Sequence, residues 1–347
     1  FLFQGTYITS TAVSYAAAAG KSHSCILGLF NGFFLFLIQL AQLFGNLISS
    51  SVFSIQISKY EEQSTSLNYS AISMQSQDLM ICGASYCHDY NIDHASFNVH
   101  KYMIYILLGV FTGFIILGAL VLIFFLDRLD VIFIKQKKSF GQQLMSLVHL
   151  HSDPRLVFFV PFLMFLGFEE AFIFGEFTKA YITCSHGLHM IGYVMMVFSG
   201  TDAIACFLFG NLRKYLHRIF IVVIGVLCYL GILGFMYIWD PTSDIWTLFM
   251  VAIGLGIGDA AWQSQTSSIT GELFSKNREA AFASLRMYEA VGFVIASAYA
   301  QHLCMDLKIY ILAGLLILVL MSYCFMELVH KVKKTEEDEA EPIPEKV

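Results

Sequence analysis

Eight long apolar stretches constrain this chain more than any other feature of its sequence. A bilayer core of about 30 Å needs roughly 20 apolar residues in a helix, because only helices and closed barrels satisfy every backbone polar group in lipid. Barrel strands would be about ten residues long and alternate in polarity. We therefore predict an all-α polytopic membrane protein with full spans at approximately 27–53, 102–126, 156–178, 187–210, 219–239, 245–269, 281–303 and 307–328, and the end of a ninth at 1–18.

The composition excludes the soluble classes. Of the 347 residues, 57% are hydrophobic and 13% are charged, whereas an average soluble chain carries about 25% charged residues. Too few charges remain to coat a water-exposed globule. The net charge of −6 shows no basic excess that would suggest nucleic acid as a partner. Because the chain starts at Phe1 without the charged region of a signal peptide, we expect an N-terminal truncation.

Charge and cysteine positions predict the orientation. Most of the 20 Lys and Arg residues fall on one side of the predicted spans, which places the C-terminus in the cytoplasm and the loop 54–101 outside. That loop contains an N-x-S/T acceptor at Asn68 and a close pair, Cys82 and Cys87, both typical of a lumenal or extracellular face. We expect glycosylation and a Cys82–Cys87 disulfide, although a chance sequon and reduced thiols are alternatives. The other six cysteines are expected to serve as small apolar residues.

The spacing of the spans predicts the domain organisation. A long basic connection divides the chain before six tightly connected spans, as in transporters built from two six-helix repeats with a cytoplasmic loop between them. We expect the remainder of an N-terminal half at 1–126, a cytoplasmic interdomain loop at 127–155, a C-terminal half at 156–328 and an acidic cytoplasmic tail at 329–347. The basic start of this tail could contact membrane lipid; a solvated tail is the alternative.

Five sequence strings carry a resemblance to a known family. They are GNLISS at 45–50, CGASYC at 82–87, EFTKAYITC at 176–184, DAAWQSQ at 259–265 and EAAFA at 279–283. They resemble the uncoordinated-93 (unc-93-like) family of the major facilitator superfamily, and in particular its A paralogue, through nearly all of the chain. The resemblance implies about twelve helices and an accessory subunit that regulates a two-pore potassium channel or another membrane protein, in the plasma membrane or an endomembrane.

A secondary transporter of a small solute, with or without proton coupling, is the alternative function. Neither a nucleophile elbow nor a complete phosphate-binding loop occurs in the sequence, so it predicts no enzyme activity and no cofactor. No cysteine or histidine group has the spacing of a metal site.

Polar residues inside the spans are the functional candidates, because each ionisable group there costs about 2.5 to 3.5 kcal/mol on insertion scales. The candidates are Glu169, Glu170, Asp202, Asp259, Gln263 and Thr266. The two glutamates lie near mid-membrane, where a proton, a solute or a partner would be contacted. The last three residues form a stripe along one helix, which predicts a face toward the bundle interior, a cavity or a partner. Interhelical hydrogen bonds that only hold the bundle together are the alternative.

Charged residues near the helix ends form a second group of candidates. Glu176 with Lys179, and Arg286 with Glu289, are three residues apart and near enough to pair. Either pair could simply anchor a helix end. The pair of Arg286 and Glu289 could instead take part in a cytoplasmic gate. A short basic loop resembles the one that major facilitator proteins repeat in each half, and its matching residues are Gly210, Arg213 and Arg218. An ordinary positive-inside loop explains these residues almost as well.

Overall fold

The computed structural model describes residues 2–20, 23–64, 82–87, 101–125, 140–212, 215, 218–241, 244–274 and 277–340. These residues form helices and short connections, and none of them lies in a strand. The elements are α1 (Leu2–Ala19), α2 (His23–Ser64), the 3₁₀ turn η1 (Gly83–Ser85), α3 (Lys101–Phe125), α4 (Phe140–Leu150), α5 (Pro154–Ala171), the π-helix η2 (Phe172–Thr183), α6 (Cys184–His186), α7 (Met190–Leu212), α8 (Arg218–Ile238), α9 (Ile245–Leu273), α10 (Arg278–Tyr299) and α11 (Met305–Ala340).

Eight helical segments in the described part of the chain are long and apolar enough to cross a membrane. They are Ile26–Val52, Ile104–Phe124, Pro154–His186, Met190–Leu212, Arg218–Ile238, Ile245–Leu273, Ala280–Tyr299 and Met305–Val332. These agree with the eight predicted spans, so the all-α polytopic membrane class is confirmed. The third is longer than predicted, because α5, η2 and α6 follow one another without a break.

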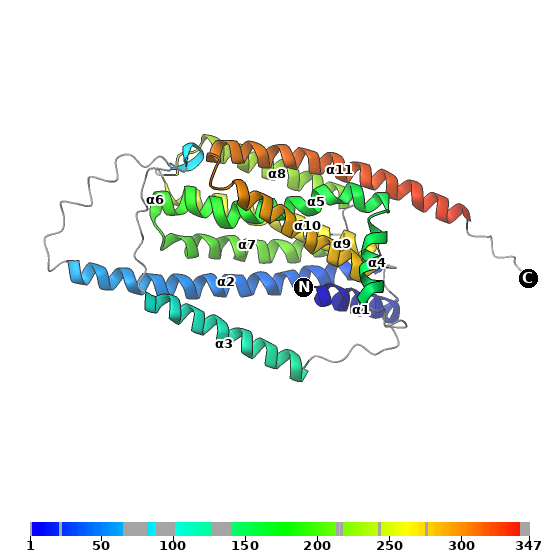
Figure 1. Cartoon of the computed structure of the whole chain (residues 1–347), viewed down its shortest axis with the longest axis horizontal. Helices are drawn as coiled ribbons and strands as arrows, with labels where there is room; N and C mark the ends of the chain where they lie inside the picture. The colour runs from blue at the N-terminus through cyan, green and yellow to red at the C-terminus, as the bar shows by residue number, and fades with distance from the viewer. Residues whose placement is uncertain are drawn as a thin grey trace, which may run out of the picture.

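Most of the helices run along one long axis (Figure 1). α2 packs along α7, α5 packs against α10 and α11, and α8 packs against α9. α3 lies beside α2 at the edge of the bundle, and its apolar side chains are largely exposed. α4 crosses one end of the bundle within the segment 127–155, which was predicted as a loop. The apolar residues of α4 recur at helical spacing, a pattern that accounts for the helix.

An aromatic cluster fixes α5, α8 and α9 relative to one another. The buried Trp262 ring lies edge-on to Phe162, Phe165 and Tyr229, with ring centroids 5.9, 5.7 and 6.3 Å apart. In lipid, helices associate by van der Waals packing rather than by the hydrophobic effect, and each such ring pair adds about 0.5 to 1.5 kcal/mol. Gly258 is required here, since a Cβ at that position would lie 2.4 Å from Tyr229.

Glycines bring two further pairs of helices into backbone contact. Between α5 and α10, a Cβ at Gly167 would lie 1.9 Å from the Glu289 carbonyl oxygen, and one at Gly292 would lie 2.1 Å from that of Met164. Small residues of this kind let membrane helices approach closely. The crossing therefore holds the middle of α10 directly against α5.

The seam between α2 and α7 is tight near both of its ends. At one end, a Cβ at Gly32 would lie 2.9 Å from the Cys206 carbonyl oxygen and 3.0 Å from the Gly210 Cα. At the other end, a Cβ at Gly192 would lie 1.7 Å from the Ser50 side-chain oxygen. The two helices are thus in contact along most of the length of α7.

Two disulfides correct the predicted cysteine pairing. Cys82 bonds to Cys184 and Cys87 bonds to Cys304, with Cα atoms 5.6 and 4.3 Å apart. The predicted Cys82–Cys87 bond is therefore wrong, and so is the prediction that Cys184 and Cys304 are merely small apolar residues. The physical reason is η1, which lies between Cys82 and Cys87 and places them beside different elements.

The segment 82–87 is also held by backbone contacts. The Met305 N–H donates to the Tyr86 carbonyl oxygen over 2.9 Å. Gly83 has a φ of +79°, which favours glycine, and a Cβ there would lie 2.8 Å from Pro241. The disulfides suit the outward face that the sequence predicts for this loop. Asn68 lies outside the described residues, so its glycosylation stays a prediction.

Candidate functional site

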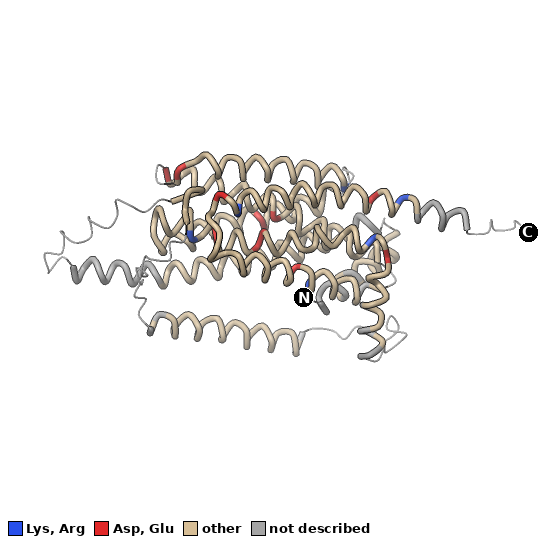
Figure 2. The backbone as a smooth tube through the Cα atoms, turned by 45° about the horizontal axis from the view of Figure 1, so that its top comes forward, with Lys and Arg blue, Asp and Glu red and all other residues tan. Residues whose placement is uncertain are grey.

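Five carboxyl groups come together near the middle of the bundle. Each lies close to the centre of its span, and we call the group the carboxyl layer. Its members are Glu169 and Glu170 on α5, Asp202 on α7, Asp259 on α9 and Glu289 on α10. Acidic positions are visible in the interior of the bundle as well as at its ends (Figure 2). The sequence singled out all five residues, but it placed Glu289 in a helix-end pair.

Glu169 is the most isolated member of the carboxyl layer. It is 1% exposed, and neither of its carboxyl oxygens has a hydrogen-bond partner. Its electrostatic neighbours are Asp259, Tyr229, Glu170 and Asp202. The Tyr229 hydroxyl is also buried without a hydrogen-bond partner. An ionised carboxylate in such surroundings is costly, because the Tyr229 hydroxyl is the one donor group that faces it and no positive charge does.

Asp202 links α7 to its neighbours. It is fully buried, and its Oδ1 accepts a hydrogen bond from the Cys206 thiol at 3.3 Å, whereas Oδ2 has no partner. Asp259 on α9 and Gln39 on α2 also interact with its carboxyl group. Because Gln39 belongs to α2, the layer reaches the seam between α2 and α7.

Glu170, which is partly exposed, and Glu289, which is buried, form the side of the layer next to Arg286. The Arg286 Nη1 atom lies 2.7 and 2.8 Å from the two Glu289 carboxyl oxygens, which confirms the predicted Arg286–Glu289 pair. The predicted position of this pair at a helix end is wrong, because Arg286 lies eight residues after the start of α10, about 12 Å along the helix. There the glycine crossing holds α10 against α5, and Glu289 faces Glu170.

The polar stripe along α9 turns toward the interior as predicted. Thr266 is 1% exposed and its hydroxyl has no hydrogen-bond partner, while Gln263 is partly exposed. Thr270 donates to the Thr266 carbonyl oxygen over 2.8 Å. Gln265, which the sequence placed beside the stripe, is also buried with both amide atoms unpartnered. The interior of α9 therefore holds more unsatisfied polar groups than a packing role requires.

Glu176 has a partner that its sequence spacing did not suggest. The Lys308 ammonium lies 2.5 Å from the Glu176 carboxylate and also donates to the Ala300 carbonyl oxygen. Glu176 lies in η2, whose wider turn changes which side chains share a face. The Lys179 ammonium lies over the Tyr86 ring, 5.8 Å from its centroid. The Glu176–Lys179 pair stays a prediction.

Tyr86 completes this end of the bundle. Burial and, to a smaller extent, the Glu176 carboxylate raise the pKa of the Tyr86 phenol above its ordinary value. The phenol thus stays neutral within the disulfide-bonded segment 82–87, where the Lys179 side chain lies over its ring.

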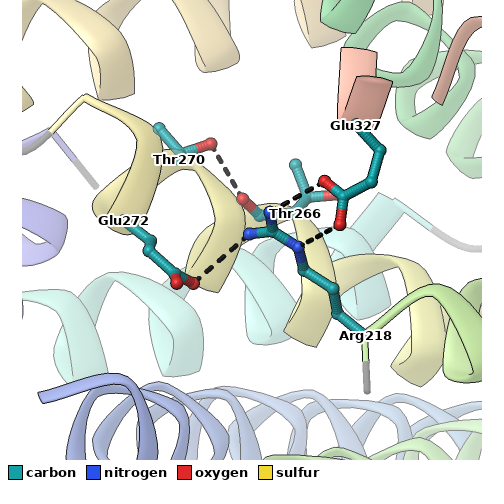
Figure 3. Close-up of polar contacts among 5 residues, drawn as sticks. All are labelled: Arg218, Thr266, Thr270, Glu272 and Glu327. Carbon is teal, nitrogen blue, oxygen red and sulfur yellow. Dashed lines mark hydrogen bonds and ion pairs between the residues drawn. The ribbon is translucent and has the colours of Figure 1, made fainter. Parts of the chain in front are cut away.

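Arg218 forms a separate ion-pair cluster (Figure 3). Its Nε and Nη2 atoms donate to the two carboxyl oxygens of Glu327 over 2.8 and 2.7 Å, and Nη1 lies 3.4 Å from a Glu272 oxygen. The cluster joins α8, α9 and α11. Two-point binding of this kind is the strong geometry for a guanidinium. The sequence analysis identified Arg218 but missed Glu327 and Glu272. A negative charge near the end of an apolar span was the sequence feature that could have identified both glutamates.

The short basic loop predicted at Gly210, Arg213 and Arg218 is supported only in part. Gly210 packs against Gly28 and Gly32 of α2, where a Cβ would lie 2.8 Å from the Gly28 carbonyl oxygen. Arg213 lies outside the described residues. Of the three predicted loop residues, the structure thus assigns Gly210 to the seam and Arg218 to a buried pair. Within the described part of the chain, no group of three or more His, Cys, Asp or Glu side chains could hold a metal ion.

The comparison with known proteins shows the family of this chain. A family model described as "Ion channel regulatory protein UNC-93" matches residues 32–326, which contain the carboxyl layer and both disulfides. The chain belongs to the UNC-93 family. The resemblance predicted from the sequence strings is thereby confirmed.

Several relatives have the A-paralogue name. "Protein unc-93 homolog A" of Xenopus laevis is 34% identical over 337 residues, which cover 94% of this chain and 71% of the relative. The human protein of the same name is 35% identical over 336 residues, covering 94% and 70%. "Putative potassium channel regulatory protein unc-93" of Caenorhabditis elegans is 25% identical over 333 residues, covering 92% of this chain and 46% of the relative.

Proposed function

We propose that this chain acts as a non-enzymatic accessory subunit that regulates a potassium channel, with two-pore potassium channels as the first class to test. The observation that carries the proposal is the match of nearly all the membrane-spanning part to a family described as ion channel regulatory proteins. The name of the Caenorhabditis elegans relative supports potassium as the ion. We further propose the plasma membrane as its location, with the C-terminus in the cytoplasm.

The seam between α2 and α7 supports an accessory role. A transporter that works by alternating access rocks one repeat against the other and opens one end of the bundle at a time. Gly32 and Gly192 instead allow backbone contact near both ends of the seam. The hydrogen bond from the Asn46 side-chain amide to the Ser199 hydroxyl, at 3.4 Å, lies between them. A seam closed at both ends suits a rigid scaffold that presents a fixed surface to a partner.

Co-expression with a panel of two-pore potassium channels tests the proposal. Full-length protein should change the whole-cell potassium current or the surface level of at least one channel, and it should co-purify with that channel in mild detergent. No change and no co-purification across several channels would contradict the proposal.

A pair of variants tests whether regulation depends on the α2–α7 seam or only on the presence of the protein at the surface. Gly32→Leu inserts a side chain into the α2–α7 seam and should abolish the effect on the channel. Gly234→Leu is the matched control, because nothing lies within 4 Å of a Cβ at that position. Equal activity of the two variants at equal surface levels would show that the seam does not matter for regulation.

A second candidate function is transport of a small solute. The carboxyl layer favours it, because polar groups from four helices face one another near the middle of the bundle. Proteoliposomes that contain the full-length protein should then take up a solute from a broad panel, and Asp259→Asn should reduce the uptake. Absence of uptake and of proton flux across the panel would remove this candidate.

A further inference from the structure

The carboxyl layer contains more acidic groups than its surroundings can stabilise as anions. Four helices contribute its five carboxyl groups. Arg286 brings one positive charge, which is bonded to Glu289. A buried charge is tolerated when it is paired and hydrogen-bonded. The carboxyl groups farther from Arg286 therefore need another way to lose their charge.

Glu169 shows this need most clearly. Neither of its oxygens has a hydrogen-bond partner, and the residue is 1% exposed. The titratable groups that face it are Tyr229 from α8, Asp259 from α9, Asp202 from α7 and its neighbour Glu170. All of them are neutral or negative. The Tyr229 hydroxyl can donate a hydrogen bond, but none of these groups brings a positive charge to Glu169, and the carboxyl groups can share a proton with it.

The second buried carboxyl group, Asp202, has similar surroundings. Its free oxygen, Oδ2, has no hydrogen-bond partner, and its titratable neighbours are Cys206 and Asp259. Asp259 in turn faces Glu289. The buried acids thus lie in one continuous group that extends from Asp202 to the pair of Glu289 and Arg286.

One side of this buried group is less buried than the rest. Glu170 and Gln263 are partly exposed, and the Arg286 side chain is 31% exposed. Glu170 interacts with Glu289, so the buried acids are connected to this less buried side of the layer. A proton needs a single acceptor oxygen and no cavity. By contrast, the described acidic side chains do not converge into a group of three that could hold a metal ion.

We propose that the carboxyl layer is a proton-binding site, in which Glu169, beside Asp202 and Asp259, holds an exchangeable proton at neutral pH. The proton comes from water and binds a carboxylate oxygen, with no transfer of electrons. The partly exposed Glu170 side is where it enters and leaves. This proposal does not depend on the identity of a channel or solute, because proton binding is a property of the protein itself.

Infrared spectroscopy of the full-length protein tests the site directly, in a detergent without carboxyl or ester groups. At neutral pH, the wild type should show the C=O stretching absorption of a protonated carboxylic acid, and this absorption should shift when the solvent is exchanged for D₂O. Glu169→Gln should reduce it. Asp244→Asn is the control: Asp244 is an exposed carboxylate that caps α9, and asparagine caps equally well.

Three outcomes would overturn the proposal. They are an absence of the absorption in the wild type at neutral pH, a wild-type absorption that does not shift in D₂O, and an equal absorption in Glu169→Gln. The first two need no variant, so they decide the question even if Glu169→Gln fails to fold. Channel currents and solute uptake do not enter these measurements, which keeps failure of the site distinct from failure of the proposed function.

Discussion

The buried pair of Arg218 and Glu327 allows a quantitative test of how α8 is held to α11. The two side chains are 9% and 5% exposed and share two short hydrogen bonds. Glu327→Gln removes the negative charge and leaves the guanidinium buried, a loss that costs about 3 to 5 kcal/mol. Glu272 lies 3.4 Å away but is 36% exposed, so its screened attraction recovers about 1 kcal/mol at most. We expect a loss of about 3 kcal/mol in the free energy of unfolding.

The double variant separates charge burial from packing. Arg218→Met combined with Glu327→Met removes both charges and keeps much of the side-chain volume, and such replacements are often close to neutral. It should therefore be more stable than Glu327→Gln alone. Unfolding of the purified protein in mixed micelles by added SDS, followed by tryptophan fluorescence, measures each free energy. Glu272→Gln is the matched control on the same guanidinium and should cost under about 1 kcal/mol.

Two results would refute this reasoning. If the double variant is as unstable as the sum of its two single variants, the charges are not coupled in the folded protein. If Glu272→Gln costs as much as Glu327→Gln, exposure does not decide the strength of the two interactions.

Three further predictions concern other contacts. Proteolysis without reduction should give cross-linked peptides in which Cys184 and Cys304 are each joined to a cysteine of the segment 82–87, as mass spectrometry can check; free thiols at both positions would contradict the fold of this segment. Gly292→Leu should prevent stable folding, measured as monodisperse protein after extraction, whereas Gly314→Leu, where a Cβ meets nothing within 4 Å, should be tolerated. Lys308→Met leaves a buried carboxylate without its ammonium and should lower the free energy of unfolding by about 3 kcal/mol in the SDS titration; a loss near zero would show that this ion pair contributes little.

The spans were predictable because apolar length is a local property of the sequence. The agreement extends to the ion pair of Arg286 and Glu289, which one helical turn brings together. The continuation of the third span through η2 was not predictable. A π-helix depends on packing against neighbouring helices, and sequence spacing assumes regular α-helical winding.

Long-range contacts were the main failure of the sequence reasoning. Cys82 and Cys87 are close in sequence, so they were paired with each other, whereas their partners lie 102 and 217 residues away. In the same way Glu176 was given a neighbour in sequence, although the Lys308 that binds it lies on α11. Only the helix arrangement determines such contacts.

The carboxyl layer could be predicted in part: its members were predictable from the sequence, but their convergence was not. The cost of burying charge in a membrane identified Glu169, Glu170, Asp202 and Asp259 as candidates one residue at a time. Their convergence depends on the tight helix crossings, which no local pattern reveals. Gly167 illustrates this, because nothing in its own sequence neighbourhood shows that α10 lies against it.

The most direct test of the central proposal is the potassium current per channel at the cell surface. Cells that express one two-pore potassium channel should show a changed current per surface channel when the full-length protein is present. The Gly234→Leu variant should reproduce this change, and the Gly32→Leu variant at equal surface level should not. An unchanged current per surface channel, across several such channels and with wild-type protein that reaches the same membrane, would contradict the account.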